Sequence, residues 1–218
     1  MKTRPSPSDA LLLIASGCAH CPAVLEGFAQ LLKQAAIGRL EVVNIDSHPE
    51  LAAELGVRSV PWFRIGEFEL QGSYSPTELK DWAARAAQPD GAGLYLAELL
   101  STGQLDRAIG LIRRHPHWLS QAIELLTDAD TGMSIKTGLG ALIEEFTGSE
   151  ILIGQITRLA LLLKNDNHGI RSDACYFLAL SQSPLALPYL QQALEDSHAE
   201  VQEIARESLE ELAELGIH

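Results

Sequence analysis

Two cysteines three residues apart, Cys18 and Cys21, are the residues of this chain best suited to chemistry. A C-x-x-C pair between a predicted strand and a predicted helix is typical of a redox dithiol. If Cys18 opens the helix, the unpaired amides and the positive dipole end favour the thiolate, the form that attacks disulfides. We therefore predict that Cys18 is the attacking thiolate and that Cys21 resolves the mixed disulfide. His20 lies between them and is predicted to tune the couple through positive charge or a hydrogen bond.

The first half of the chain must supply the elements that position this pair. Apolar residues at 11–15 predict a buried strand before the cysteines, and apolar positions after Pro22 recur at helical spacing. Further strands are predicted at 40–45, 61–65 and 67–71, and helices at 22–36, 49–55 and 76–87. This order predicts an α/β domain with a mixed sheet and helices on both of its faces.

Strand signals disappear after a Gly- and Pro-containing break at 88–93. We predict a first domain at 1–88, a linker at 89–93 and an all-α domain at 94–218. Helices are predicted at 94–100, 105–113, 118–126, 135–146, 151–163, 170–180, 185–194 and 201–215. The pattern D-N-H at 166–168 matches D-S-H at 196–198, an offset of 30 to 31 residues that suits one helix pair. Stacked helix pairs predict an α-solenoid.

Charge and cysteine usage narrow the possible partners and the compartment. The formal net charge is −13, from 16 basic and 29 acidic residues, which argues against nucleic acid or an anionic membrane as a partner. No apolar run is long enough to span a bilayer. Three cysteines do not form a disulfide framework, so we predict a cytoplasmic protein in which the C-x-x-C pair is chemically active.

The first ninety residues resemble the thioredoxin superfamily. The resemblance lies in the C-A-H-C run at 18–21, in N-I-D at 44–46, in G-V-R-S-V-P at 56–61 and in the glycines that follow. It implies a thioredoxin-like fold in which Pro61 is cis and lies against the dithiol. The backbone of Val60 would then be presented to an extended substrate strand, as in β-strand addition.

The chain departs from a typical thioredoxin in several places. The segment before residue 11 is too short for the additional N-terminal strand and helix of that family. The positions of the family's buried acid and its lysine neighbour hold Leu12 and Val42. These departures favour a specialised substrate. Residues 94–218 resemble HEAT-like repeats, a family that mostly binds other proteins and offers no catalytic motif to transfer.

The cysteines and the remaining histidines could instead bind a metal or serve a structural role. A zinc site needs about four ligands and no second C-x-x-C is present, although a cluster shared between two subunits would need only two per chain. Cys175 lies on an apolar helix and is predicted to be a buried core residue. The histidines at 115 and 117 are predicted at a helix break, and His168 and His198 at turns between helices, so no metal site is predicted.

We thus predict a thiol–disulfide oxidoreductase that needs no cofactor and acts on protein disulfides. Its catalytic residues are Cys18 and Cys21, His20 tunes them, and Val60 and Pro61 bind substrate. Its expected partners are a protein substrate with a disulfide or thiol and a reductase or other thiol donor, and the helical domain would recruit a protein. The alternative is an adaptor or assembly chaperone that works through the helical repeats. Metal or cluster carriage is a third hypothesis.

Overall fold

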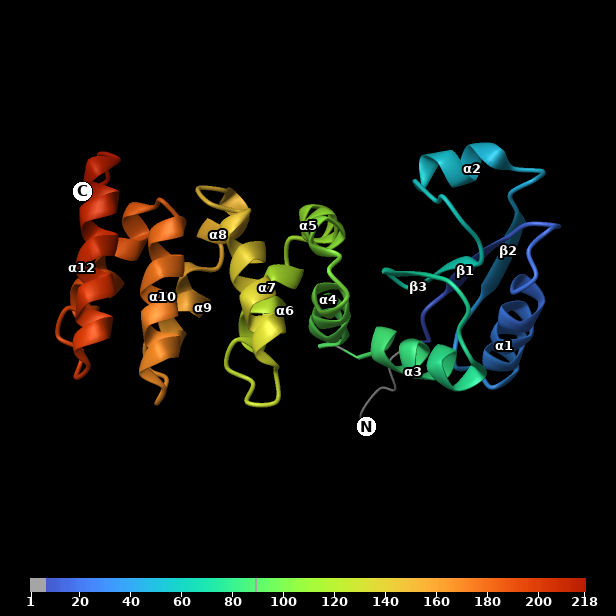
Figure 1. Cartoon of the computed structure of the whole chain (residues 1–218), viewed down its shortest axis with the longest axis horizontal. Helices are drawn as coiled ribbons and strands as arrows, with labels where there is room; N and C mark the ends of the chain where they lie inside the picture. Colours follow the sequence, from blue (N-terminus) through green and yellow to red (C-terminus); the bar gives the residue numbers. More distant parts are fainter. Residues whose placement is uncertain (1–6, 89) are drawn as a thin grey trace. The chain divides into compact units, whose positions relative to one another are not determined.

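The computed structural model describes residues 7–88 and 90–218 (Figure 1). Residues 1–6 of the predicted first domain and Pro89 of the predicted linker lie outside the described residues. The chain divides into two compact units between Leu94 and Tyr95, and each unit is described by itself. Across the described ranges, no helix combines the length and the apolar character needed to cross a membrane.

The N-terminal unit is built on a mixed four-stranded sheet of order β2-β1-β3-β4. Its elements are β1 (Ala10–Ile14), α1 (Cys21–Lys33), β2 (Leu40–Asn44), α2 (Pro49–Glu54), β3 (Trp62–Ile65), β4 (Phe68–Gln71) and α3 (Pro76–Ala86). Strand β1 pairs parallel to β2 and antiparallel to β3, and β4 pairs antiparallel to β3. The predicted α/β order with a mixed sheet is therefore confirmed.

Large apolar side chains on one face of the sheet form the core of this unit. Leu12 and Phe63 are cross-strand partners on β1 and β3, and both are fully buried. Phe28 of α1 meets the Phe63 ring edge-on at 5.0 Å, and Trp82 of α3 meets the Phe68 ring edge-on at 6.1 Å. Helices α1 and α3 thus cover the same face, whereas α2 lies on the other side of the strands in Figure 1.

Local sequence signals explain where these helices begin and end. Ser75 caps α3: its hydroxyl accepts from the Glu78 amide at 3.3 Å, and the Glu78 carboxylate accepts from the Ser75 amide at 2.7 Å. Helix α1 ends at Lys33 rather than at residue 36, because Ala35 adopts a positive φ of 53° that a right-handed helix cannot contain.

The C-terminal unit is helical in every regular element that the structure describes there. Its helices are α4 (Gly91–Ser101), α5 (Leu105–Arg114), α6 (Trp118–Leu125), α7 (Met133–Glu144), α8 (Glu150–Ile153), α9 (Ile156–Leu162), α10 (His168–Leu180), the 3-10 helix η1 (Pro184–Ala186), α11 (Leu187–Ala193) and α12 (Ala199–Glu214). Helix α4 begins in the N-terminal unit at Gly91, inside the stretch predicted as a linker.

The single helix predicted at 151–163 is wrong, because the structure divides it into α8 and α9. Ser149 caps α8 by accepting a hydrogen bond from the Leu152 amide at 3.3 Å. The chain then turns at Gly154 and Gln155, where the Gln155 amide bonds back to the Leu152 carbonyl. Glycine favours such a break because it has a poor helix propensity. The apolar periodicity continues on both sides of Gly154, which is why it predicted one helix.

Helices of this unit pack against helices that lie one to three elements away in the chain. Helix α10 contacts α9, α11 and α12, and α6 contacts α7 and α9, an order compatible with stacked helix pairs. The N-cap residues of α10 and α12 are Asn167 and His198, which lie 31 residues apart. His168 is therefore the first residue of α10, whereas His198 is the N-cap of α12. The aligned sequence patterns had made these two histidines equivalent.

An ion pair joins the first turn of α10 to the turn that precedes α12. The Arg171 guanidinium donates two hydrogen bonds of 2.8 Å to the two carboxylate oxygens of Asp196. It also donates to the Asn165 carbonyl at 2.9 Å, and Asp196 accepts from the His198 amide at 2.9 Å. Both charged side chains are largely shielded from solvent. This two-point geometry fixes one turn relative to the other.

The stability of the helical unit should depend on the charge of Asp196. The Arg171 hydrogen bonds and the His198 amide hold the pKa of the Asp196 carboxyl below its ordinary value. A lowered folded-state pKa contributes stability that is present at neutral pH and lost as the pH falls through that pKa. We expect Asp196→Asn to destabilise the unit at pH 7, with the difference from wild type shrinking toward pH 3.

Urea unfolding followed by helical circular dichroism at several pH values would measure this effect. Glu195→Gln is the matched control, because it removes the neighbouring exposed carboxylate and should leave the acid dependence of the wild type in place. An Asp196→Asn variant whose difference from wild type is the same at every pH would contradict the prediction.

Candidate redox site

Cys18 and Cys21 form a disulfide, with an Sγ–Sγ distance of 2.12 Å. The two cysteines differ in access to solvent: Cys18 is partly exposed, whereas the relative solvent exposure of Cys21 is only 3%. In such a pair the accessible sulfur can meet an incoming disulfide, and the shielded sulfur can react only with its neighbour. The attacking role of Cys18 and the resolving role of Cys21 stay predictions, and the difference in exposure is the geometry that they require.

Cys18 does not open the helix, since α1 begins three residues later at Cys21, with His20 as the N-cap. The helix start still reaches the sulfur, because the Cys21 amide donates a hydrogen bond to Cys18 Sγ at 3.1 Å. This is one of the amides that a helix leaves without an internal partner. A helix-start amide aimed at Sγ favours a thiolate there once the disulfide is reduced.

Strand pairing brings the second part of the site to the cysteines. Leu13 near the end of β1 is paired with Trp62 at the start of β3, so the segment after β1 and the segment before β3 leave the same edge of the sheet. Cys18 Sγ lies 3.7 Å from the Val60 carbonyl oxygen, and the Val60–Pro61 peptide bond is cis. Val60 is half-buried and Pro61 is buried. The structure thus brings together Cys18, Cys21, Val60 and Pro61 from segments forty residues apart.

His20 is exposed at the N-cap of α1. Within the described part of the chain its side chain makes no capping hydrogen bond to the helix. The ring is therefore free to face a substrate or the dithiol, and its tuning role stays a prediction.

Three polar residues that were given no site role from the sequence hold the turn before Cys18. The Ser16 amide donates to the Asp46 carboxylate at 2.8 Å, and the Asn44 side-chain amide donates to the Ser16 hydroxyl at 3.1 Å. Hydrogen bonds from the backbone amide of Ser16 and, next, from its side chain hold the pKa of Asp46 below its ordinary value. The signal in the sequence was the polar pair Asn44 and Asp46 at the end of an apolar strand, since Asn44 is the last residue of β2 and β1 ends at the same edge.

Cys175 belongs to a different environment and should not share the chemistry of the pair. It is fully buried in α10, and this burial raises the pKa of its thiol to about 12. After reduction, we expect Cys18 of the native protein to react readily with a thiol reagent, because it is the partly exposed sulfur. Cys175 should react only after denaturation, because a buried protonated thiol is a poor nucleophile.

Reagent-derived mass on tryptic peptides would identify which cysteine reacts in each state. Modification of Cys175 in the native protein at a rate similar to that of Cys18 would contradict this assignment.

Comparison with known proteins agrees with the fold of the N-terminal unit. Residues 10–84 match the family model of the thioredoxin domain, and this range contains the sheet, the C-x-x-C pair and the cis-proline. The N-terminal unit is therefore a thioredoxin-like domain, and the chain continues into a helical region beyond the match. A thioredoxin-like domain that carries a C-x-x-C pair supports a thiol–disulfide function.

Other comparisons add little to this assignment. No curated protein matches the chain. Two solved structures, both described as engineered proteins, are 20% and 19% identical to it, with TM-scores of 0.39 and 0.38. The first alignment covers 66% of this chain and 76% of that protein, and the second covers 63% of this chain and 44% of that protein. At these TM-scores the likeness has no bearing on fold or function.

Proposed function

We propose that this protein is a thiol–disulfide oxidoreductase that acts on protein disulfides through Cys18 and Cys21. The observation that carries the proposal is the hydrogen bond from the helix-start amide of Cys21 to the partly exposed Cys18 sulfur. That amide favours the Cys18 thiolate, and the buried sulfur of Cys21 is already within bonding distance.

The exchange proceeds in two displacement steps. In the reduced protein, the Cys18 thiolate attacks one sulfur of a substrate disulfide, forms a mixed disulfide and releases the other substrate sulfur as a thiolate. The Cys21 thiol then loses its proton to solvent, and its sulfur attacks Cys18 Sγ and releases the second substrate thiolate. Two electrons pass to the substrate, and the Cys18–Cys21 disulfide results. A thiol donor such as a dithiol reductase restores the reduced form, and the same steps in reverse oxidise a substrate dithiol.

The segment before β3 is the proposed binding site for the substrate backbone. The Val60 carbonyl is 3.7 Å from Cys18 Sγ and belongs to a half-buried residue beside the buried Pro61. An extended peptide with its sulfur at Cys18 would lie along this segment and would pair with its backbone, as added strands do. We propose that Val60 and Pro61 bind substrate in this way and that His20 tunes the couple from the N-cap of α1.

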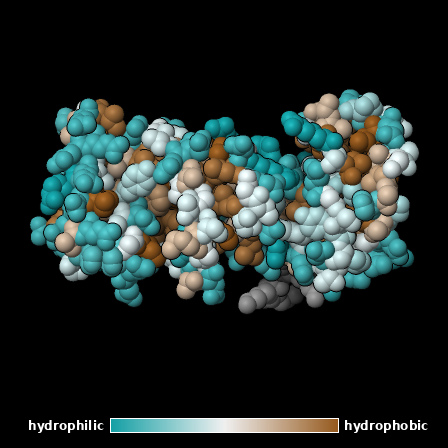
Figure 2. Space-filling model, in the orientation of Figure 1, coloured by the Kyte–Doolittle hydropathy of each residue, from teal (hydrophilic) through white to brown (hydrophobic). Residues whose placement is uncertain are grey.

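We further propose that the helical unit recruits a protein partner, which would raise the local concentration of substrate. Large apolar side chains remain exposed on that unit, among them Met133, Leu161 and Leu185. Figure 2 shows apolar patches between the hydrophilic parts of its surface. We place the activity in a reducing compartment such as the cytoplasm, because a C-x-x-C pair there serves chemistry rather than structure.

A redox titration combined with a turnover assay would test the main proposal. The purified protein would be equilibrated in buffers of defined thiol–disulfide ratio, and its free thiols counted. We expect one reversible two-electron transition, together with reduction of a model protein disulfide by catalytic amounts of the protein with an excess of dithiol. A pair that does not titrate, or a rate no higher than that of dithiol alone, would reject the proposed activity.

A further inference from the structure

Two histidine rings of the C-terminal unit lie face to face. The ring centroids of His168 and His198 are 3.7 Å apart, and the ring planes differ by 8°. His168 is the first residue of α10, whereas His198 is the N-cap of α12. These two positions differ by one residue relative to the starts of their helices. A repeated sequence pattern therefore does not by itself account for the stacking. The sequence interpretation of both histidines as turn residues describes their location but not this contact.

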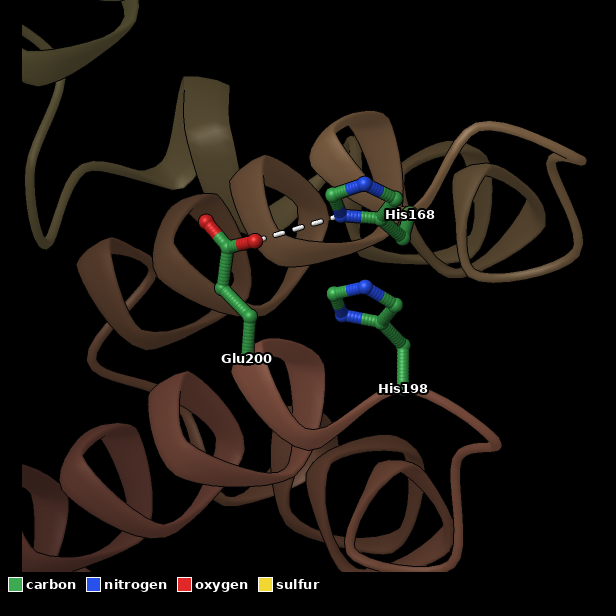
Figure 3. A group of neighbouring side chains, drawn as sticks. All are labelled: His168, His198 and Glu200. Atoms are coloured by element: carbon green, nitrogen blue, oxygen red, sulfur yellow. Dashed lines mark ion pairs between the residues drawn. The ribbon is translucent and has the colours of Figure 1, made fainter.

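A carboxylate completes a group of three metal-binding side chains. Glu200 Oε2 lies 3.2 Å from His168 Nδ1, and one ligand atom from each of the three residues lies within 4.8 Å of the others. Both rings turn a nitrogen toward the carboxylate (Figure 3). His198 Nδ1 is buried and has no hydrogen-bond partner among the residues that the structure describes. A buried polar atom without a partner costs free energy, which a bound ligand would offset.

We propose that His168, His198 and Glu200 bind a divalent transition-metal ion such as Zn²⁺. Imidazole nitrogen and carboxylate oxygen are ordinary zinc ligands, and three protein ligands with a water molecule in the fourth position form a common site. The donor set excludes magnesium and calcium as preferred ions, because both favour sites made of oxygen atoms. The ion would hold the start of α10 to the start of α12.

The Glu200 carboxylate is the group of the three that attracts a cation, and other charges nearby oppose it. The Arg171 guanidinium is close by, but its hydrogen bonds go to the Asp196 carboxylate and to backbone carbonyls. Asp173 of α10 has a raised pKa through burial and, next, the negative charge of Glu200. The N-terminal ends of α10 and α12 oppose a cation through their dipoles. The Glu200 carboxylate must overcome this field, so its charge should be essential for binding.

Binding requires a small rearrangement that the exposed side chains allow. A metal ion lies in the plane of the imidazole that binds it, so two parallel rings cannot both bind one ion until one of them rotates. Zinc–nitrogen bonds of about 2.0–2.1 Å also bring the donor atoms closer together than 4.8 Å. The side chains of His168 and Glu200 are 47% and 55% exposed, which leaves them free to move. Loss of the stacked arrangement is thus a structural signature of the ion.

Calorimetric titration with Zn²⁺ would test the site in the full chain, with Cys18 and Cys21 oxidised so that no accessible thiol competes. We expect one ion per chain and a weakening of about tenfold or more in both Glu200→Gln and His198→Gln. The exposed pair His48 and Glu50 is the matched control, because it has the same His–Glu contact, at 3.3 Å, without a second histidine. His48→Gln should bind Zn²⁺ as the wild type does.

Imidazole resonances in nuclear magnetic resonance spectra supply the second readout, since Zn²⁺ should shift those of His168 and His198. Glu200 is exposed, so Glu200→Gln should keep the fold, which circular dichroism would verify. Absence of saturable binding, or affinity unchanged in Glu200→Gln and His198→Gln, would overturn the proposal. The site lies in the other unit from the dithiol, so its failure would leave the oxidoreductase proposal standing, and the reverse also holds.

Discussion

Replacing Cys18 with serine is expected to reduce disulfide exchange to the uncatalysed background, whereas replacing Cys21 with serine should trap substrates. Cys18 is the partly exposed cysteine, and its Sγ accepts a hydrogen bond from the Cys21 amide at 3.1 Å. Without it, the buried Cys21 sulfur cannot reach an incoming disulfide. Without Cys21, the first displacement still occurs but the mixed disulfide has no internal sulfur to resolve it. Non-reducing electrophoresis and mass spectrometry of the adducts would measure both results.

The matched control is Cys175→Ala, which removes the third cysteine of the chain. Cys175 is fully buried and its thiol has a raised pKa, so exchange and trapping should be unchanged once the variant is shown to be folded. Adducts that form on Cys18→Ser and not on Cys21→Ser would reverse the roles of the two cysteines. Exchange at the wild-type rate by Cys18→Ser would remove Cys18 as the nucleophile.

The second large effect is expected in the core of the thioredoxin-like domain, where Phe63→Ala should lower the free energy of unfolding by about 3–5 kcal/mol. Phe63 is fully buried on β3. Its ring meets Phe28 edge-on at 5.0 Å and Tyr74 edge-on at 5.2 Å. Removing it leaves a cavity between the sheet and α1, which surrounding side chains fill only in part. Urea unfolding followed by the fluorescence of Trp62 and Trp82 would measure the loss.

Leu32→Ala is the matched control on α1, because Leu32 is 42% exposed. It should change the free energy of unfolding by no more than about 0.5 kcal/mol. Phe63→Leu should cost less than Phe63→Ala, because leucine fills more of the site. If Phe63→Ala proved no more costly than Leu32→Ala, the packing described for this face of the sheet would be wrong.

Much of the N-terminal domain could be predicted from residues that act locally. Short apolar runs, apolar positions at helical spacing, Pro22 in the first turn of α1 and the capping pair Ser75 and Glu78 all act within a few residues. The structure contains strands and helices at these places. The Ser16–Asp46 contact was missed because it joins residues 30 apart in the sequence. Its existence depends on β1 and β2 ending at the same edge of a parallel pair.

In the helical unit, too, the sequence predicted local features but missed finer details of the structure. Apolar periodicity located its helices, but it did not reveal the break at Gly154 or the one-residue difference between the positions of His168 and His198. Periodicity averages over several turns, so a short interruption hardly changes it. A one-residue difference in cap position is equally invisible, although it decides which side chains meet.

By itself, the sequence determined the C-x-x-C pair that we propose to be reactive, the class of each domain and the start of most helices, since these depend on residue type and near-neighbour spacing. Only the tertiary structure decided which distant groups touch. The antiparallel pairing of β1 with β3 places the Val60 carbonyl beside Cys18 Sγ, and the packing of α10 against α12 brings His168 to His198. Both contacts depend on the burial of apolar faces that lie far apart in the chain, and residue spacing does not encode how such faces meet.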